Sequence, residues 1–384
     1  MLPAQRAAQI APFEVMEILA RAHALEAQGR RVIHMEIGEP DFTAADPVVE
    51  AGARAMREGR TAYTAALGLP ALREAIAAFY ATRFGVRVPA SRIAVPAGAS
   101  GGLLLAMAAL VEPGSEVLVP DPGYPGYRHF VRVFEGTARA LALNAASAFQ
   151  PTLESVRAAW SPRTAGIILG SPSNPTGTTI APKELRAIAA FVGERRGFLV
   201  IDEIYQGLVY GEAPATAAGL AGSTVVVNSF SKYFCMTGWR LGWVVLPEAL
   251  VRSYEKLAQH MFICPSAIAQ HAALAAFEPR TLQVLEARRR EFEARRDYFV
   301  PQLERLGLAV AAPPSGAFYV YADCSAHAKD GMAFALELLD RSGVAATPGI
   351  DFGENDARRH VRFAYTRGMD DLREAVSRLQ DHLG

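Results

Sequence analysis

The chain has 384 residues, of which 51% are hydrophobic and 20% charged, a balance typical of a globular protein with a large core. Its formal net charge of zero and its isoelectric point near 7.1 argue against a nucleic-acid binder or a polybasic membrane-surface protein. The first residues lack a signal-peptide layout, and the longest apolar run, 99–111, is too short to span a bilayer. Three cysteines without CxxC spacing indicate neither a zinc site nor a disulfide framework, so we expect no metal and a reducing cytoplasm.

Short apolar strands alternate with helical patterns through the middle of the chain. Strands interleaved with helices predict an α/β fold with a mostly parallel sheet that is covered by helices. The expected strands are 93–96, 116–119, 165–169, 198–201, 224–228 and 241–246, and the expected helices are 99–111, 182–195 and 247–260.

The character of the sequence changes after about residue 280. A long charged helix is expected there, with glutamates and arginines at helical pair spacings. The expected elements are helices at 281–306 and 331–341 and strands at 309–312, 317–321, 344–347 and 360–365. They predict a smaller α+β domain. We therefore expect a large α/β domain at 43–279, and a small domain made of 1–42, with an N-terminal arm, plus 280–384.

Candidate binding residues follow the ends of the expected strands, because ligands of open α/β sheets lie outside the carboxyl ends of their strands. After the first strand the sequence AGASGG opens a helix, so the backbone at Gly98, Ala99 and Ser100 can bind an anion such as phosphate. After the second strand the sequence PDPGYPGY places Tyr124 where it can stack on a flat ring. Tight packing and a proline-glycine turn around a buried tyrosine explain these two features equally well.

The third and fourth strands also end in polar residues. In GSPSNPTG, the amide of Asn174 can donate a hydrogen bond to a ligand oxygen, or it can close an Asx turn. In DEIYQG, Asp202 ends a strongly apolar strand, where a carboxylate must be paired, solvated or in contact with a ligand. Glu203 is expected to point to the opposite face of the sheet, and Tyr205 is close enough to share the site of Asp202.

The sequence SFSK follows the fifth strand and contains Lys232. Only four of the 39 basic residues of the chain are lysines. Arginine stays protonated, whereas a desolvated lysine can lose its proton and act as an amine nucleophile. A surface cation beyond a strand end is the alternative explanation. Ser229 and Ser231 can hold phosphate oxygens, and Arg240 can add a charge-assisted contact.

Together the strand ends supply an anion site, a stacking ring, a carboxylate and an amine. Pyridoxal 5′-phosphate needs all four. Its aldehyde takes a lysine Schiff base, its ring nitrogen takes an acidic partner, and its phosphate binds at a helix N-terminus. The sequence therefore predicts a pyridoxal-phosphate site.

The chain resembles the class I/II aminotransferases, which are fold type I pyridoxal-phosphate enzymes similar to aspartate aminotransferase. The similarity covers nearly the whole chain, and the blocks that carry it stand in the family's order and approximate spacing. The blocks are MEIGEPDF near residue 38, TAYTAALGLPALREAIA near residue 63, SNPTG (173–177), DEIY (202–205), SFSK (229–232), GWRLGW (238–243), GAFYVY (316–321) and HVRFAY (360–365). The resemblance implies transfer of an amino group between an L-amino acid and a 2-oxo acid.

The resemblance also implies roles for single residues around the cofactor ring. Lys232 would be the Schiff-base lysine and the proton shuttle, and Asp202 would be the partner of the pyridinium nitrogen. Tyr205 and Asn174 would hydrogen-bond the phenolic oxygen of the ring, and Tyr124 would stack on the ring.

Further roles follow for the phosphate and the substrate. The phosphate would be held by Ala99, Ser100, Ser229 and Arg240. Tyr63 would join them from the other subunit of a homodimer. Arg362 would bind the substrate α-carboxylate as a bidentate fork, and Gly38 would lie close to the substrate.

One feature departs from part of the family. Members that are specific for dicarboxylates place a second arginine against the side-chain carboxylate of the substrate, and this sequence has no assignable counterpart. The stretch 11–25, with Phe13, Val15 and Met16, would cover the site with apolar groups instead. This pattern favours a neutral or hydrophobic amino donor, although ordinary packing of an amphipathic helix explains it equally well.

Three other functions compete with transamination. A β-eliminating lyase is one, because fold and cofactor do not determine the reaction. Ser229 and Lys232 fit the S-x-x-K motif of serine acyl-transfer enzymes, but none of the four lysines begins the companion KTG motif. A non-catalytic regulator built on this fold would carry a DNA-binding module, and we expect none because the family's arm begins within the first fifteen residues.

Overall fold

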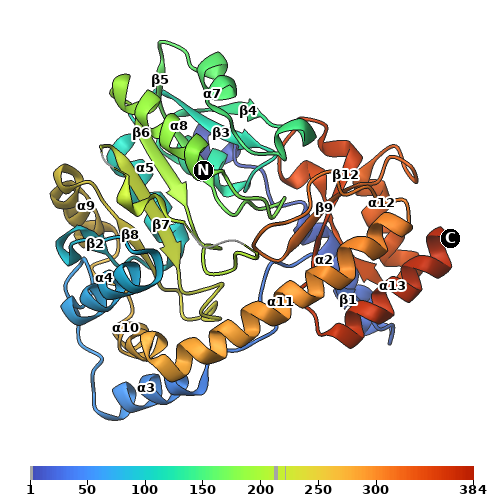
Figure 1. Cartoon of the computed structure of the whole chain (residues 1–384), viewed down its shortest axis with the longest axis horizontal. Helices are drawn as coiled ribbons and strands as arrows, with labels where there is room; N and C mark the ends of the chain where they lie inside the picture. The colour runs from blue at the N-terminus through green and yellow to red at the C-terminus, as the bar shows by residue number, and fades with distance from the viewer. Residues whose placement is uncertain (1–2, 212–214, 221) are drawn as a thin grey trace.

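A seven-stranded sheet forms the centre of the larger of two lobes (Figure 1). The computed structural model describes residues 3–211, 215–220 and 222–384. The strand order is β2-β8-β7-β6-β5-β3-β4, and the sheet is parallel except for β8, which is antiparallel to both of its neighbours. The strands are β2 (Ile93–Ala94), β3 (Glu116–Asp121), β4 (Thr137–Ala142), β5 (Thr164–Gly170), β6 (Phe198–Asp202), β7 (Thr224–Ser229) and β8 (Gly242–Val245).

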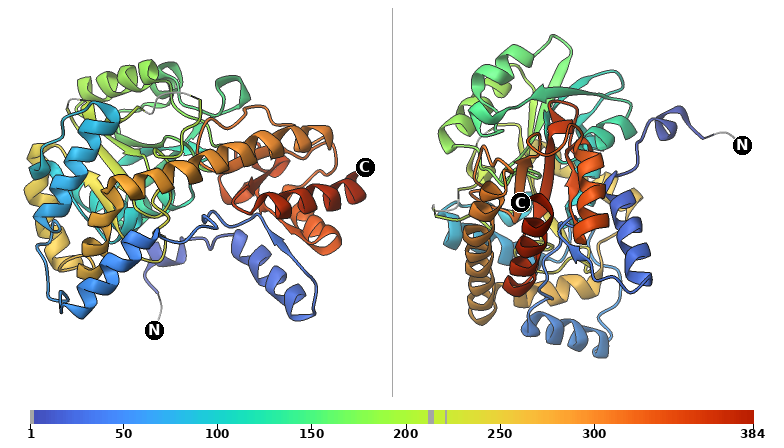
Figure 2. Two further views of the ribbon diagram at one scale, coloured as in Figure 1. Left: turned by 60° about the horizontal axis from the view of Figure 1, so that its bottom comes forward. Right: turned by 90° about the vertical axis from the view of Figure 1, so that its right-hand side faces the viewer.

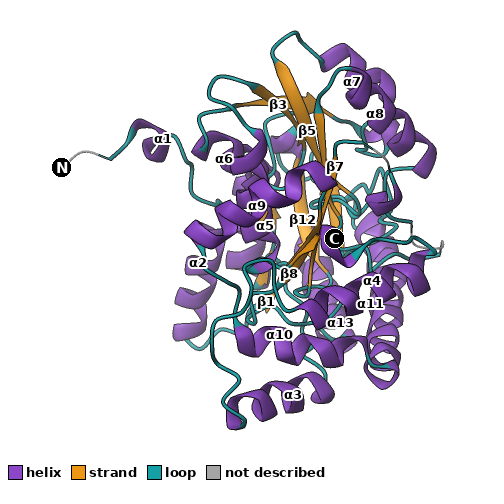
Figure 3. Cartoon of the chain, turned by 90° about the vertical axis from the view of Figure 1, so that its left-hand side faces the viewer, coloured by secondary structure: helices purple, strands orange, loops and turns teal. Residues whose placement is uncertain are grey.

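Helices cover both faces of this sheet (Figure 3). They are α5 (Gly98–Leu110), α6 (Gly126–Val133) and α9 (Glu248–Met261) on one face and α7 (Leu153–Ala159) and α8 (Pro182–Glu194) on the other. Side chains of a strand alternate between the two apolar layers, so Val225 and Val227 pack toward α5 while Val226 packs toward α8. This double burial explains the continuous apolar runs in the sequence.

Three more helices pack together near β2 and β8 (Figure 1). They are α3 (Asp46–Arg57), α4 (Pro70–Phe84) and α10 (Ala267–Leu274). Proline stands at the start of both α3 and α4, where its missing N–H leaves no helical hydrogen bond unmade. In the part of the chain that the structure describes, no helix is both long and apolar enough to cross a membrane.

The smaller lobe is built from both ends of the chain (Figure 2). Its antiparallel sheet has the order β11-β12-β9, and a separate parallel pair joins β1 to β10. The strands are β1 (Ile33–His34), β9 (Tyr319–Asp323), β10 (Val344–Ala345), β11 (Thr347–Pro348) and β12 (His360–Ala364). The helices are α2 (Val15–Ala27), α12 (Gly331–Glu337) and α13 (Met369–Leu383). The short helix α1 (Gln5–Ala8) lies instead against α6 of the larger lobe, where Arg6 pairs with Glu135 at 3.0 Å.

The long helix α11 (Pro279–Arg305) runs from the larger lobe to the smaller one (Figure 1). Near its start, Glu286 pairs with Arg83 at 2.8 Å and accepts a hydrogen bond from the Tyr233 hydroxyl at 2.6 Å. Further along, the buried Arg295 pairs with Asp41 at 2.9 Å. The helix therefore makes contacts near its start and further along its length as it runs between the two lobes.

The expected fold class is confirmed, with a few local differences. The strand expected at 309–312 is wrong: only one isolated bridge forms there, between Ala309 and Asp323. The helix expected at 331–341 is α-helical only to Glu337 and then continues as a π-helical turn over Leu338–Ser342. The edge strand β4 was not expected, because its sequence TARALA is mostly exposed and lacks the apolar run of a buried strand.

Candidate active site

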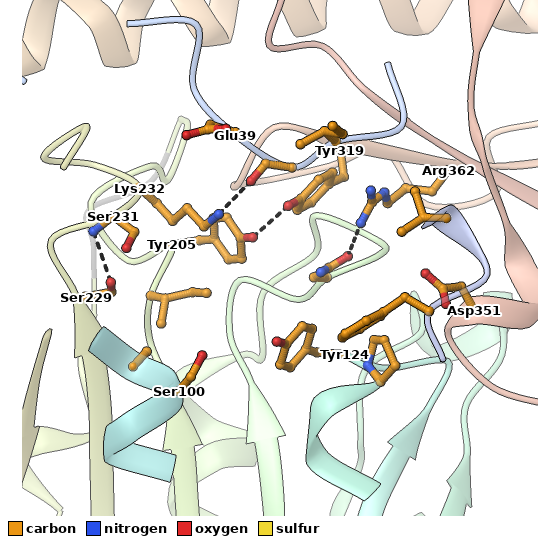
Figure 4. A pocket seen from close by; sticks show the side chains of 18 of the residues that line it. Glu39, Ser100, Tyr124, Tyr205, Ser229, Ser231, Lys232, Tyr319, Asp351 and Arg362 are labelled. Carbon is orange, nitrogen blue, oxygen red and sulfur yellow. Dashed lines mark hydrogen bonds between the residues drawn. The ribbon is translucent and has the colours of Figure 1, made fainter. Parts of the chain in front are cut away.

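A cavity of about 440 Å³ lies between the two lobes, where the carboxyl ends of the parallel strands face the small sheet (Figure 4). Twelve of the fourteen predicted site residues line it: Gly38, Ala99, Ser100, Tyr124, Asn174, Asp202, Tyr205, Ser229, Ser231, Lys232, Arg240 and Arg362. Gly98 does not line the cavity but immediately precedes the lining residue Ala99, as the first residue of α5. Tyr63 does not line the cavity of its own chain, and it is 81% exposed.

Lys232 reaches the cavity from the loop that follows β7. Its Nζ donates a hydrogen bond to the Gly38 carbonyl at 2.6 Å (Figure 4). Burial, together with the Arg362 and Arg240 charges, lowers the pKa of Lys232 to about 8, against the opposing effect of Glu39 and Asp202. The amine is therefore available as a base or nucleophile near neutral pH.

Asp202 is the last residue of β6 and is buried. Its Oδ2 accepts a hydrogen bond from the Tyr127 hydroxyl at 2.8 Å, and its Oδ1 accepts one from the Ile204 N–H at 3.1 Å. Burial raises the pKa of Asp202 to about 6, while Tyr127, Ile204 and Lys232 act in the opposite direction. A buried carboxylate held this way at the wall of a cavity can bind a protonated group of a ligand.

The neighbouring Glu203 points to the other side of the sheet. Its carboxylate accepts hydrogen bonds from the Thr216 hydroxyl at 2.7 Å and the Ala217 N–H at 2.6 Å. The alternation of side chains along the strand therefore separates two adjacent carboxylates into a cavity group and a structural group.

Tyr127 was not among the predicted site residues. It lies in the first turn of α6, three residues after Tyr124, which precedes the helix. Their rings contact edge to face, with centroids 5.3 Å apart. That spacing in PDPGYPGY was the signal that could have identified Tyr127.

The N-terminus of α5 has the geometry to bind an anion. Gly98 has a φ of +78°, and a Cβ at this position would lie 2.6 Å from the Arg240 Nη2. The glycine therefore lets the Arg240 guanidinium approach the free N–H groups of the helix. The Arg240 Nη1 is 3.5 Å from the Ser231 Oγ, and Ser229 and Ser231 both line the same cavity.

Arg362 comes from β12 in the smaller lobe and is buried. Its Nη1 donates to the Asn174 Oδ1 at 2.9 Å, and its Nη2 donates to the Thr347 Oγ1 at 3.0 Å and to the Glu36 carbonyl. The guanidinium is thus held from both lobes, with its charge directed at the cavity by neutral partners.

Tyr319 joins the two halves of the site and was also missed from the sequence. Its hydroxyl lies 2.7 Å from the Tyr205 hydroxyl, and its ring centroid lies 4.4 Å from the Arg362 Cζ (Figure 4). A Cβ on Gly38 would collide with the Tyr319 hydroxyl, at 1.8 Å. The block GAFYVY contains both Tyr319 and Tyr321, and only the position of the strand in the structure shows that Tyr319 is the one that lines the cavity.

Among the described residues, no group of three or more histidine, cysteine, aspartate or glutamate side chains is arranged to hold a metal ion. The donor set of the cavity is instead an amine, a carboxylate, an arginine at a helix N-terminus, a tyrosine ring and a second arginine. These groups suit an organic ligand with a phosphate and a flat ring, together with a substrate carboxylate.

Comparison with known proteins agrees with this chemistry. Residues 30–379 match the family model for aminotransferases of class I and II. The chain is 38% identical to the valine–pyruvate aminotransferase of Mycobacterium tuberculosis over 374 residues, covering 97% of this chain and 96% of that protein.

Solved structures give the same result. An aminotransferase from Mycobacterium tuberculosis superposes with a TM-score of 0.96 at 37% identity, covering 100% of this chain and 99% of that one. A mutant of the aspartate aminotransferase of Thermus thermophilus superposes with a TM-score of 0.94 at 34% identity, covering 99% of both chains.

Proposed function

Because the chain belongs to the class I and II aminotransferases and is a transaminase, we propose that its cavity holds pyridoxal 5′-phosphate on Lys232. In one half of the cycle an L-amino acid gives up its amino group and leaves as a 2-oxo acid. In the other half a second 2-oxo acid takes up that group and leaves as an amino acid, so the exchange needs no external oxidant or reductant. The observation that carries this proposal is the desolvated Lys232 amine in one cavity with Asp202 and Arg362.

The residues of the larger lobe fit the cofactor. The N-terminus of α5, Ser229, Ser231 and Arg240 would hold its phosphate. Asp202 would hold a proton at its ring nitrogen, and Tyr124 would stack on its ring. Tyr205 and Asn174 would contact its phenolic oxygen.

When bound, the cofactor supplies an aldehyde for the amino group and a ring that withdraws electrons from the substrate α-carbon. Nζ of Lys232 takes the proton from that carbon, which an arginine at this position could not do near neutral pH. The Gly38 carbonyl, 2.6 Å from Nζ, keeps the amine on the side of the N-terminal segment. Arg362 binds the α-carboxylate and so determines which bond of the α-carbon faces the amine.

We also propose a homodimer in which Tyr63 reaches the phosphate of the partner subunit. Tyr63 is 81% exposed and lies outside the cavity of its own chain. Thr64 donates its N–H to the Cys264 Sγ at 3.4 Å, so the segment of Tyr63 is joined to the segment that carries the exposed Phe262 and Ile263. A measured mass of one chain at micromolar concentration would contradict the dimer.

The domain division at 43–279 and the cytoplasmic location remain predictions. The start of α11 at Pro279 supports the boundary, although the helix itself contacts both lobes. Free thiols at Cys235, Cys264 and Cys324 support a reducing compartment.

The comparisons do not favour the β-eliminating lyase or the serine acyl-transfer enzyme. The Ser229 hydroxyl contacts the Leu241 carbonyl and the Ser231 N–H, and Lys232 contacts the Gly38 carbonyl. S-x-x-K chemistry needs a hydrogen bond between the serine hydroxyl and the lysine amine, and these contacts do not include one.

An absorption spectrum tests the proposed function. The purified protein should show a violet-absorbing band that borohydride removes, an amino acid should bleach it, and a 2-oxo acid should restore it. The Lys232→Ala and Lys232→Arg variants should lose both the borohydride-sensitive band and turnover. A fully active Lys232→Ala enzyme would disprove the role of Lys232. Release of ammonia in place of 2-oxo acid exchange would favour a lyase.

A further inference from the structure

Part of the cavity wall is not used by the cofactor or by the α-carboxylate. It consists of the residues before and in the first turns of α2 together with two residues after β11: Phe13, Val15, Met16, Leu19, Asp351 and Phe352. We call this set the side-chain wall. Asp351 lies beside Arg362 and Tyr124 in Figure 4, on the side of the cavity away from Lys232.

The side-chain wall is apolar except for Asp351, and two of its apolar side chains are partly exposed. Helix α2 buries Ile18, Ala22 and Leu25 completely or nearly so in the core of the protein. In contrast, Phe13 and Met16 line the cavity and are still 41% and 54% exposed. The exposure of these two side chains is therefore not explained by core packing, and it leaves apolar area that a ligand can cover.

The wall also carries one carboxylate, and its position is fixed. Asp351 is buried, and its Oδ1 accepts a hydrogen bond from the Glu14 N–H at 2.9 Å. The Arg128 Nη2 donates to the Asp351 carbonyl at 2.9 Å, which anchors the same residue to the larger lobe. The Asp351 Oδ2 accepts no hydrogen bond from any residue that the structure describes, although the side chain lines the cavity.

Each cationic side chain that lines the cavity already has a role in the proposed function. Its lining contains Lys232, Arg240 and Arg362, against the carboxylates of Glu36, Glu39, Asp202 and Asp351. The proposed function uses Arg240 for the phosphate, Arg362 for the α-carboxylate and Lys232 for the proton. An acidic substrate side chain would therefore meet Asp351 with no lining cation left to pair with it.

Resting on the proposed function, we infer that the enzyme exchanges amino groups between amino acids and 2-oxo acids with neutral, mainly apolar side chains, such as leucine, methionine and phenylalanine. The apolar residues of the side-chain wall cover the body of the substrate side chain. Asp351 rejects aspartate and glutamate by like-charge repulsion. Phe13, Met16 and Asp351 are thus the specificity-determining residues.

The test is the rate of each half-reaction, followed at the violet band, with alanine, leucine, methionine, phenylalanine, aspartate, glutamate and lysine. Leucine, methionine and phenylalanine should exceed aspartate and glutamate in kcat/KM by at least about 10-fold, because one well-filled apolar subsite discriminates by roughly that factor. A preference for the acidic donors, or for lysine, would overturn the inference and leave the proposed function standing. Failure of every donor would overturn both.

Variants separate the two parts of the wall. Phe13→Ala with Met16→Ala should lower kcat/KM for phenylalanine by about 10-fold and leave alanine unchanged, since alanine does not reach the wall. Val284→Ala is the matched control, because Val284 is 40% exposed and does not line the cavity. Asp351→Asn keeps the acceptor for the Glu14 N–H and removes the charge. It should raise kcat/KM for glutamate relative to leucine by about 10-fold, and an unchanged ratio would contradict the role of Asp351.

Discussion

The two walls of the cavity are built in different ways. The larger-lobe wall, with Ser229, Lys232, Asp202 and the start of α5, consists of residues at the carboxyl ends of parallel strands or shortly after them. The smaller-lobe wall, with Gly38, Tyr319, Asp351 and Arg362, brings together residues up to 324 positions apart in the sequence, such as Gly38 and Arg362. The first wall holds charged groups at the ends of rigid strands. The second depends on contacts between the lobes, so it can be altered without disturbing the first.

A change in the larger-lobe wall should have the largest effect. Asp202→Asn keeps the size of the side chain and a partner for the Tyr127 hydroxyl, but it removes the charge. We expect kcat to fall by about 10²- to 10⁴-fold, the range for the loss of an acid–base group. The violet band should persist, because Lys232 is unchanged. Tyr127→Phe is the milder control, and equal rates for Asp202→Asn and the wild type would disprove the role of Asp202.

The corresponding change in the smaller-lobe wall is Arg362→Ala, with Arg362→Lys as the variant that keeps the charge. Removing one partner of a buried charged contact costs about 2–5 kcal/mol, so kcat/KM should fall by roughly 30- to 5,000-fold. The loss should appear mainly in KM for amino acids, while cofactor affinity should change little. If both variants lost the cofactor as well, the two walls would not be independent.

The pKa of Lys232 gives a pH-dependent comparison. The neutral amine is the nucleophile, and burial places its pKa at about 8 instead of about 10.5. Uptake of pyridoxal phosphate by the cofactor-free enzyme should therefore rise about tenfold per pH unit below 8 and level off above it. Stopped-flow absorbance measures this rate, and a rise that continued to pH 10 would show that the amine is not desolvated.

The smallest effect is expected where the two walls meet. Tyr319→Phe removes the hydroxyl that lies 2.7 Å from the Tyr205 hydroxyl but keeps the ring against Arg362. The loss of one hydrogen bond is worth about 0.5–1.5 kcal/mol, so kcat should fall by no more than about 10-fold. The pH profile of the violet band should shift as well, because Tyr205 is predicted to contact the cofactor. Tyr321→Phe, which alters the neighbouring strand residue outside the cavity, should leave both unchanged.

Much of the larger-lobe wall could be predicted from local sequence. Apolar runs mark buried strands, and the residue after each run lies at the carboxyl end of the sheet, so Asp202, Asn174 and Lys232 could be placed without coordinates. Gly98 could be placed in the same way at the start of a helix. Tyr127 shows the limit, because its spacing from Tyr124 indicates a neighbour of the site but does not reveal that its hydroxyl donates to Asp202.

The sequence by itself determined the order of the buried strands along the chain, the alternation of strands with helices, the lysine expected from SFSK and the family. Only the tertiary structure decided that Tyr319 bridges Tyr205 and Arg362, that Glu36 supplies a carbonyl to Arg362, and that Asp351 stands in the side-chain wall. The physical reason is the separation along the sequence of the residues that interact. Strand and helix patterns come from interactions between near neighbours, whereas the smaller-lobe wall comes from packing between segments that the sequence places hundreds of residues apart.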